Sequence, residues 1–221
     1  MTAKALHNFD TAARIAVLGG SGRTGHHILE RIAALGGRPA VLVRDRSKLH
    51  VKVGVDVVIG DARDGQAVSA ALRGAHAVID ATGPSADADE HFGAAVAANV
   101  LDCMQVERVR RLVTITGAMV GGGELPLMYK LILAMMKKRD RAVLEGRRKG
   151  EALIMASKLE WTILRPPRLT DGPATGKVEA GPDLPLSGGA SISRADLAHY
   201  AVTCATSPRH ARQAVRVKTA G

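Results

Sequence analysis

Four glycines near the start of the sequence are spaced in a way that suits the binding of a pyrophosphate. Gly19, Gly20, Gly22 and Gly25 follow the apolar residues 15–18, and helix-period apolar residues continue from there to residue 35. The glycines can be read as Gly20-x-Gly22-x-x-Gly25 or as Gly19-x-x-Gly22-x-x-Gly25. In both readings side chains are missing where a phosphate must approach the backbone, and a helix begins there with free N–H groups and a positive dipole end. The order of strand, glycine turn and helix predicts a dinucleotide-binding site.

Basic residues after the second apolar run favour NADP(H) over NAD(H) as the dinucleotide. Arg44 ends the run at residues 39–43, and Arg46 and Lys48 follow closely. A guanidinium offers paired donors that fit a 2′-phosphate, whereas an acidic residue at this place binds the free ribose hydroxyls. Asp45 could be that acidic residue if the strand ended one place later. NAD(H) and a plain solvated basic loop therefore stay open as alternatives.

Two further strand ends carry residues suited to the adenosine half of the cofactor. Asp61, with Ala62 beside it, follows the apolar residues 56–59 and could accept a hydrogen bond from the adenine amino group. A helix cap is the alternative reading of Asp61. Thr82 and Gly83 follow residues 77–81 and are placed to run along the ribose, although a simple strand-ending turn explains them almost as well.

The elements that must position these residues alternate between strand and helix. Strands are expected at residues 14–18, 39–43, 56–59, 77–81, 111–115, 161–165 and 214–218, with helices at 22–35, 64–72, 89–105, 140–157 and 194–206. This alternation predicts an α/β fold, a Rossmann-like doubly wound parallel sheet whose ligands bind at the carboxyl ends of the strands. We expect residues 1–13 to be an N-terminal extension and residues 14–221 to form a single domain. Its substrate-side segments are 117–140 and 166–192, the second being loop-rich with room for a short hairpin.

Composition narrows the function classes. The formal net charge of +10 could indicate nucleic acid, but no interleaving of aromatic and basic residues and no zinc-ligand spacing accompanies it, so we expect no nucleic-acid partner.

No apolar stretch reaches the roughly 18–20 residues that a membrane span requires. The N-terminus has no apolar signal region, and Cys103 and Cys204 lie in apolar helical contexts that predict buried, reduced thiols, so a cytoplasmic location is expected. His26 and His27 lack a third ligand at helical spacing, and no metal site is expected.

With these segments in place, the chain resembles the atypical short-chain dehydrogenase/reductase superfamily, and within it the NAD(P)H-binding, NmrA-like branch that includes biliverdin IXβ/flavin reductases. The resemblance covers residues 14–217 and rests on six stretches: Val17-Leu-Gly-Gly-Ser-Gly-Arg-Thr-Gly25, Val41-Leu-Val-Arg-Asp-Arg-Ser-Lys-Leu49, Gly60-Asp61, Leu112-Val-Thr-Ile-Thr116, Trp161-Thr-Ile-Leu-Arg-Pro-Pro167 and Ile192-Ser-Arg-Ala-Asp-Leu197.

The resemblance implies a set of cofactor contacts and an activity. Its pyrophosphate contacts are Ser21, Gly22, Arg23 and Thr24; the 2′-phosphate contacts are Arg44 and Lys48; the adenine contacts are Asp61 and Ala62; the ribose contacts are Thr82 and Gly83; and the nicotinamide is flanked by Thr116, Pro166 and Arg168. The implied activity is an NADPH-dependent oxidoreductase that passes hydride to a planar, anionic small molecule such as a flavin, quinone or tetrapyrrole. Such a reaction needs no protein acid if solvent or substrate supplies the proton, so Thr116 and Arg168 are the catalytic candidates.

This sequence departs from the family pattern where proton donors are expected. Tyr129 is followed at the fourth place by Leu133 and not by the lysine of the usual Tyr-x-x-x-Lys pair. Gly117 replaces a serine and Arg168 a histidine of the reductase branch, while Arg147 stands where many members have a lysine, four residues before a glutamate. These departures keep an alternative open, a non-catalytic NADP(H) sensor that acts through a protein partner. An epimerase-like activity on nucleotide sugars fits less well, because it needs the missing pair.

The Met-rich segment 125–136 is unusual and follows three glycines at residues 121–123. It lies where a substrate loop is expected, and methionine side chains adapt to irregular apolar ligands. Three interpretations remain open for it: a mobile apolar lid or protein-partner surface, an ordinary buried helix, or a contact with a membrane surface.

Overall fold

A computed structural model of the chain describes residues 13–83, 89–121 and 124–221. Its main sheet has the strand order β3-β2-β1-β4-β5-β6-β10-β8, and every pair is parallel except the last. The strands of this sheet are β1 (Arg14–Leu18), β2 (Arg38–Val43), β3 (Asp56–Ile59), β4 (Ala77–Asp80), β5 (Arg111–Ile115), β6 (Glu160–Arg165), β8 (Val178–Gly181) and β10 (Gln213–Thr219). The predicted Rossmann-like α/β fold is confirmed.

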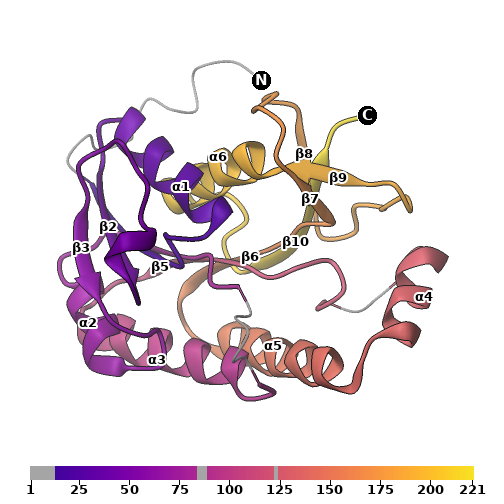
Figure 1. Cartoon of the computed structure of the whole chain (residues 1–221), viewed down its shortest axis with the longest axis horizontal. Coiled ribbons are helices and arrows are strands. Elements are labelled where there is room, and N and C mark those ends of the chain that lie inside the picture. Colours follow the sequence, from indigo (N-terminus) through magenta and orange to yellow (C-terminus); the bar gives the residue numbers. More distant parts are fainter. Residues whose placement is uncertain (1–12, 84–88, 122–123) are drawn as a thin grey trace.

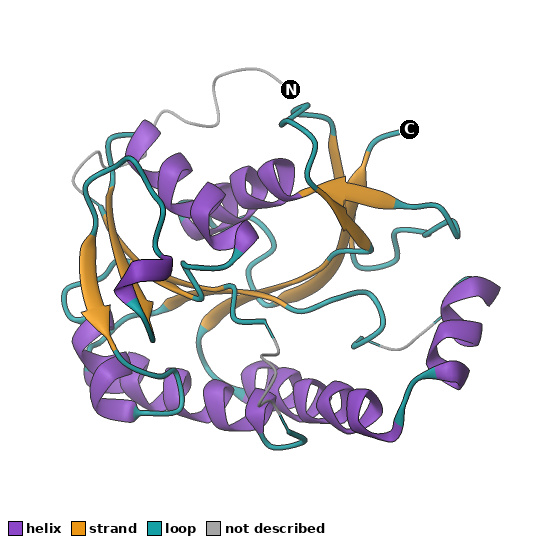
Figure 2. Cartoon of the chain, in the orientation of Figure 1, coloured by secondary structure: helices purple, strands orange, loops and turns teal. Residues whose placement is uncertain are grey.

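Helices cover both faces of the sheet (Figures 1 and 2). They are α1 (Arg23–Ala34), α2 (Gly65–Leu72), α3 (Phe92–Val106), α4 (Leu127–Met135), α5 (Lys138–Ala156) and α6 (Arg194–Ala205), with a short 3₁₀ turn, η2 (Arg46–Lys48). α1 and α6 pack together over one face, and α2, α3 and α5 over the other, which gives two hydrophobic clusters with the sheet between them. α4 stands apart at the edge of the molecule.

The α3–α5 contact is unusually close, because glycines replace side chains along it. A Cβ on Gly146 would lie 2.3 Å from the carbonyl oxygen of Glu90, and one on Gly150 would lie 2.6 Å from that of Gly93. This close approach holds α5 alongside α3, on the face of the sheet from which Arg147 and Glu151 reach the residues that follow β4 and β5. The helix thereby delivers two of its polar side chains to the site described below.

The loop-rich segment at residues 166–192 differs from the expected hairpin. Its strands β7 (Arg168–Thr170) and β9 (Ser191–Ser193) pair in parallel with each other, and β8 joins the main sheet antiparallel to β10. Asp196, at the start of α6, ties the intervening loop down by accepting hydrogen bonds from the backbone N–H groups of Thr175 and Gly176 at 2.9 and 2.8 Å. Pairing partners this distant in sequence cannot be read from local turn signals.

Several sequence expectations concern residues outside the described part of the chain, including residues 1–12 of the expected extension and Gly122 and Gly123. The long helix α3 begins at Phe92, where the Asp89 carboxylate accepts from the backbone N–H of Phe92 at 3.0 Å. Across the described ranges, every helix is too short or too polar to cross a membrane.

Candidate cofactor and substrate site

The glycine turn between β1 and α1 is shaped by two close backbone approaches. Gly19 has φ +76°, and a Cβ there would lie 2.7 Å from the carbonyl oxygen of Ala81. A Cβ on Gly25 would lie 2.3 Å from the carbonyl oxygen of Gly19, which itself accepts from the N–H of Gly22 at 3.0 Å. Gly20 is required for a different reason, because a Cβ there would meet the side chain of Val41 at 2.1 Å. Gly19, Gly20 and Gly25 are thus each needed for the turn, and both readings of the glycine spacing fit it.

A small cavity of about 280 Å³ opens above this turn at the carboxyl ends of β1, β2, β3 and β4. The first-turn N–H groups of α1, which have no acceptor within the helix, begin beside it. The structure brings to its lining these residues predicted to contact the cofactor: Gly19, Ser21, Gly22, Arg44, Asp61, Ala62, Thr82 and Gly83.

The other residues predicted for this half lie around the cavity and do not line it. Thr24 and Gly25 belong to the first turn of α1, and Lys48 is exposed at the end of η2. The guanidinium of Arg23 points to Asp171, its Nη1 lying 3.3 Å from Oδ2. Asp171 also accepts from Arg194 at 2.6 Å, so the glycine turn is tied to the loop that follows β7.

Arg44 lines the cavity, whereas its neighbour Asp45 does not. The Asp45 carboxylate accepts from the hydroxyl of Ser47 at 2.7 Å and from its N–H at 2.9 Å, which caps η2. These two hydrogen bonds lower the pKa of Asp45. Asp45, the acidic residue that could have bound the ribose hydroxyls, therefore stabilises the local turn.

Asp61 faces the cavity while paired with Arg63. Both carboxylate oxygens of Asp61 accept from the Arg63 guanidinium at 3.0 Å, and this interaction lowers the pKa of Asp61. The N-cap of α2 is Asp64, whose side chain accepts from the N–H of Gln66 at 2.9 Å. The helix cap, which was the alternative interpretation of Asp61, is therefore provided by Asp64. Thr82 is held by Asp80, which accepts from its N–H and its hydroxyl at 2.9 and 2.7 Å.

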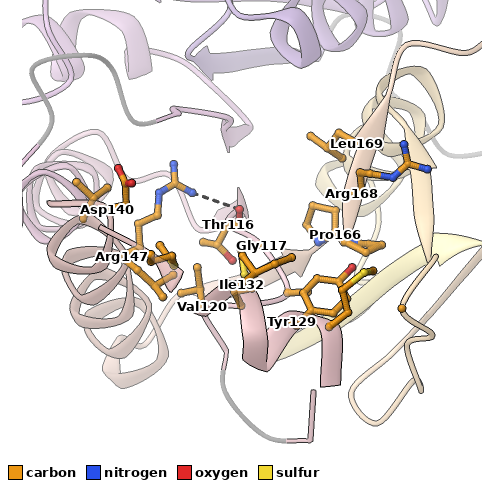
Figure 3. Close-up of a pocket in the computed structure, with 18 of the residues that line it drawn as sticks. Thr116, Gly117, Val120, Tyr129, Ile132, Asp140, Arg147, Pro166, Arg168 and Leu169 are labelled. Atoms are coloured by element: carbon orange, nitrogen blue, oxygen red, sulfur yellow. Dashed lines mark hydrogen bonds between the residues drawn. The ribbon is translucent and has the colours of Figure 1, made fainter. Parts of the chain in front are cut away.

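Arg147 on α5 connects the two strand ends on which the cofactor halves are expected. Its guanidinium donates to the carbonyl oxygen of Thr82 at 2.7 Å and to that of Thr116 at 3.2 Å (Figure 3). Burial lowers the pKa of Arg147, and the nearby charges of Asp80 and Glu151 oppose that shift. From the sequence, Arg147 was noted only because it stands where many family members have a lysine. Its four-residue spacing from Glu151 was the available signal that both side chains share one helix face.

Glu151 is a buried carboxylate beneath the end of β5. It accepts from the hydroxyl of Thr116 at 2.6 Å and from the Arg165 guanidinium at 2.5 Å. The proton of the Thr116 hydroxyl is therefore committed to Glu151, and the oxygen keeps lone pairs with which to accept a hydrogen bond. Thr116 can orient a ligand in this arrangement, but it does not offer it a proton.

A second and larger cavity, of about 830 Å³, adjoins Thr116 and Arg147. Its walls are mostly apolar and come from four parts of the chain: residues 116–120, 128–136, 139–147 and 166–169, together with Gly188 and Gly189. Its lining residues include three arginines, Arg139, Arg147 and Arg168, and one acidic residue, Asp140. The lining therefore suits an apolar molecule with an anionic group.

Figure 3 shows Asp140 and Arg147 on one side of this larger cavity and Tyr129, Pro166 and Arg168 on the other. Tyr129 is buried on the α4 side, and burial raises the pKa of its phenol against the opposing effect of Arg168, so the phenol stays protonated at neutral pH. Arg168 comes from β7, and its guanidinium points away from Thr116. Pro166 lies between them at the end of β6. Tyr129 thus supplies a neutral hydroxyl that the sequence pattern had set aside.

The two cysteines lie away from both cavities. Cys103 and Cys204 are buried, as expected, and burial raises the pKa of the Cys204 thiol to about 11. Within the described ranges, no group of three or more His, Cys, Asp and Glu side chains is placed to hold a metal ion.

Comparisons with known proteins agree with this geometry. A model of the NAD(P)H-binding family matches residues 19–208. An uncharacterized chloroplastic protein from Arabidopsis thaliana is 28% identical over 202 residues, which cover 86% of this chain and 70% of that protein.

Two solved structures show the same fold. ChuY, described as an anaerobillin reductase from Escherichia coli O157:H7, gives a TM-score of 0.74 at 24% identity over 93% of this chain and 96% of its own. A short-chain dehydrogenase/reductase from Veillonella parvula DSM 2008, solved in complex with NADP, gives 0.76 at 17% identity over 95% of both chains. At such identities the likeness is one of fold.

Proposed function

The chain belongs to the NAD(P)H-binding family, as its resemblance predicted, and from that premise we propose that it is an NADPH-dependent reductase of a planar, anionic acceptor. The acceptor classes that fit are flavins, quinones and tetrapyrroles. One observation carries the proposal: Thr82 lines the small cavity at the glycine turn, Thr116 lines the large apolar cavity, and Arg147 donates to the backbone carbonyls of both. A dinucleotide whose adenosine half lies in the small cavity would extend its nicotinamide past Arg147 to Thr116 and Pro166, where it would face an acceptor held in the large cavity.

The cofactor side fits a dinucleotide with a 2′-phosphate. The turn leaves no room for a Cβ at Gly19, and the start of α1 presents N–H groups to an anion. Arg44 is at the cavity and Asp45 is engaged by Ser47, which supports NADPH over NADH. Asp61 and Ala62 would lie along the adenine, and Thr82 and Gly83 along the ribose.

The substrate side would bind and orient the acceptor more than activate it. When bound, NADPH supplies a hydride, that is, two electrons and one proton, and the acceptor takes up one further proton. Thr116 and Pro166 would fix the position of the nicotinamide, with the Thr116 oxygen as an acceptor only. Tyr129 is the neutral hydroxyl of the lining from which the further proton can come, and Arg147 offers a fixed positive charge to an anionic substrate. Arg168 points away from Thr116 and would act at the outer edge of the cavity.

NADPH oxidation against a panel of flavins, quinones and biliverdin tests this proposal. We expect turnover with at least one member of the panel, and faster turnover with NADPH than with NADH. Tight NADPH binding without turnover of any acceptor would instead support the sensor alternative. That alternative draws on the engaged Thr116 hydroxyl and on the missing serine at Gly117.

A further inference from the structure

The short helix α4 carries a contiguous apolar stripe that the rest of the described chain leaves uncovered. Leu127, Leu131 and Met135 recur every four residues and are 72%, 55% and 84% exposed. Met128 and Ile132 extend the stripe on one side and are also exposed. An amphipathic helix of a globular protein normally buries such a face, and a contiguous exposed one marks an interaction site.

Basic side chains surround this stripe. Lys130 is exposed on α4, and Lys137 and Lys138 follow its end. Arg141, in the first turn of α5, donates to the carbonyl oxygens of Leu133 and Ala134 at 3.1 and 3.3 Å. These hydrogen bonds fix the start of α5 against the last turn of α4. Residues 124–141 hold five basic and two acidic side chains. The segment thus combines an apolar face with an excess of positive charge.

We propose that α4 docks on the surface of an anionic membrane. Leu127, Leu131 and Met135 would enter the boundary between headgroups and acyl chains, while Lys137 and Lys138 would meet anionic headgroups. The excess of positive charge around the stripe distinguishes an anionic lipid surface from a second copy of the chain as the partner of this face. A second copy of the chain would bring two excesses of positive charge together, and like charges at an interface are unfavourable. An anionic lipid surface satisfies both the apolar stripe and its basic border.

The position of α4 gives the contact a structural consequence. α4 lies at the edge of the molecule (Figure 1), and Met128 and Ile132 belong both to the exposed stripe and to the wall of the large cavity. Docking would therefore place one wall of that cavity against lipid. The membrane contact itself does not rest on the proposed reductase reaction, and it can be tested without turnover.

The test is co-sedimentation of the full chain with vesicles of phosphatidylcholine alone or mixed with phosphatidylglycerol. We expect binding to the mixed vesicles and little to the neutral ones, with binding weakened by added salt. The double variants Leu131→Gln with Met135→Gln and Lys137→Gln with Lys138→Gln should each lower the partition coefficient about tenfold or more. Val106→Gln is the matched control, because Val106 is 72% exposed on α3, away from α4, and it should bind as the unmodified chain does.

Three results would overturn the proposal. They are absence of binding to the mixed vesicles, equal binding by the double variants, and a concentration-dependent dimer that Leu131→Gln with Met135→Gln abolishes, measured by size exclusion with light scattering. Because the substituted side chains are exposed, thermal unfolding midpoints close to that of the unmodified chain should show that each variant is folded.

Discussion

The two cavities that Arg147 connects, through the carbonyls of Thr82 and Thr116, are built in different ways. The small cavity lies at the ends of β1 to β4, beside a glycine turn in which Gly19 and Gly25 permit backbone contacts that no side chain would allow. The large apolar cavity is formed by side chains from four segments, one of which is the peripheral helix α4. A backbone-built site has few ways to change without loss of the fold. A site walled by side chains can be altered for a different ligand while the sheet stays the same.

The strongest test of this contrast is to fill the backbone contact at Gly25. Gly25→Val would place a Cβ 2.3 Å from the carbonyl oxygen of Gly19, so α1 must move away from the turn. We expect unfolding to become easier by about 4 kcal/mol and NADPH binding to be lost. Denaturant unfolding and fluorescence titration with NADPH measure the two effects. Gly54→Val is the control, because a Cβ there meets nothing within 4 Å, and its change should stay within about 0.5 kcal/mol.

The next largest effect is expected at Glu151, which accepts a hydrogen bond from Thr116 in the lining of the large cavity. Glu151→Gln removes a charge whose side chain is 2% exposed and leaves the Arg165 guanidinium without its partner. Breaking a buried pair from one side costs about 3 kcal/mol. Glu145→Gln on the same helix loses an exposed pair with Arg148 and should cost less than about 1 kcal/mol. Equal costs in urea unfolding would show that Glu151 does not support the site.

A smaller and more selective effect is expected at Arg44, in the lining of the small cavity. Arg44→Gln should weaken NADPH binding about tenfold and leave NADH binding unchanged, because only NADPH carries the 2′-phosphate. Arg46→Gln provides the comparison, since Arg46 lies in η2 and does not line the cavity. Dissociation constants for both dinucleotides decide the matter. Equal loss of NADH and NADPH affinity in Arg44→Gln would contradict the 2′-phosphate assignment.

The smallest expected effect concerns the apolar cavity and leaves the cofactor untouched. Tyr129→Phe should lower kcat for an acceptor a few-fold, up to about tenfold, with NADPH affinity unchanged. The pKa of Tyr129 is raised, so its phenol keeps its proton above the pH at which free tyrosine ionises. The rate of the unmodified chain should therefore fall only at a pH above about 10, and the variant should lack that fall.

Tyr200→Phe is the matched control for this experiment. The Tyr200 hydroxyl lies 2.8 Å from Nε2 of His210, and Tyr200 lines neither cavity. Its removal should leave the pH profile of kcat as it is. A Tyr129→Phe variant with the kcat and pH profile of the unmodified chain would exclude the phenol as proton source.

The sequence predicted the cofactor side in more detail than the substrate side. Ser21, Arg44 and Asp61 each come shortly after the end of a strand, and parallel strands bring their carboxyl ends to one edge of the sheet. The boundaries of β1, β3 and β5 match their predicted ranges. The pairing of β7 with β9, and the engagement of Asp45 and Asp61 by Ser47 and Arg63, could not be predicted in this way.

What the sequence determined by itself is the sheet, the glycine turn and the family, because each depends on residues close together in the chain. Tertiary structure decided which polar groups surround the large cavity and how they are paired. The glycine-lined contact of α3 with α5 carries Arg147 to the carbonyls of Thr82 and Thr116. The same contact places Glu151 where it takes the Thr116 proton, and α4 brings Tyr129 to the facing wall. These side chains come from segments distant in sequence, and only the packing of helices against the sheet fixes how they meet.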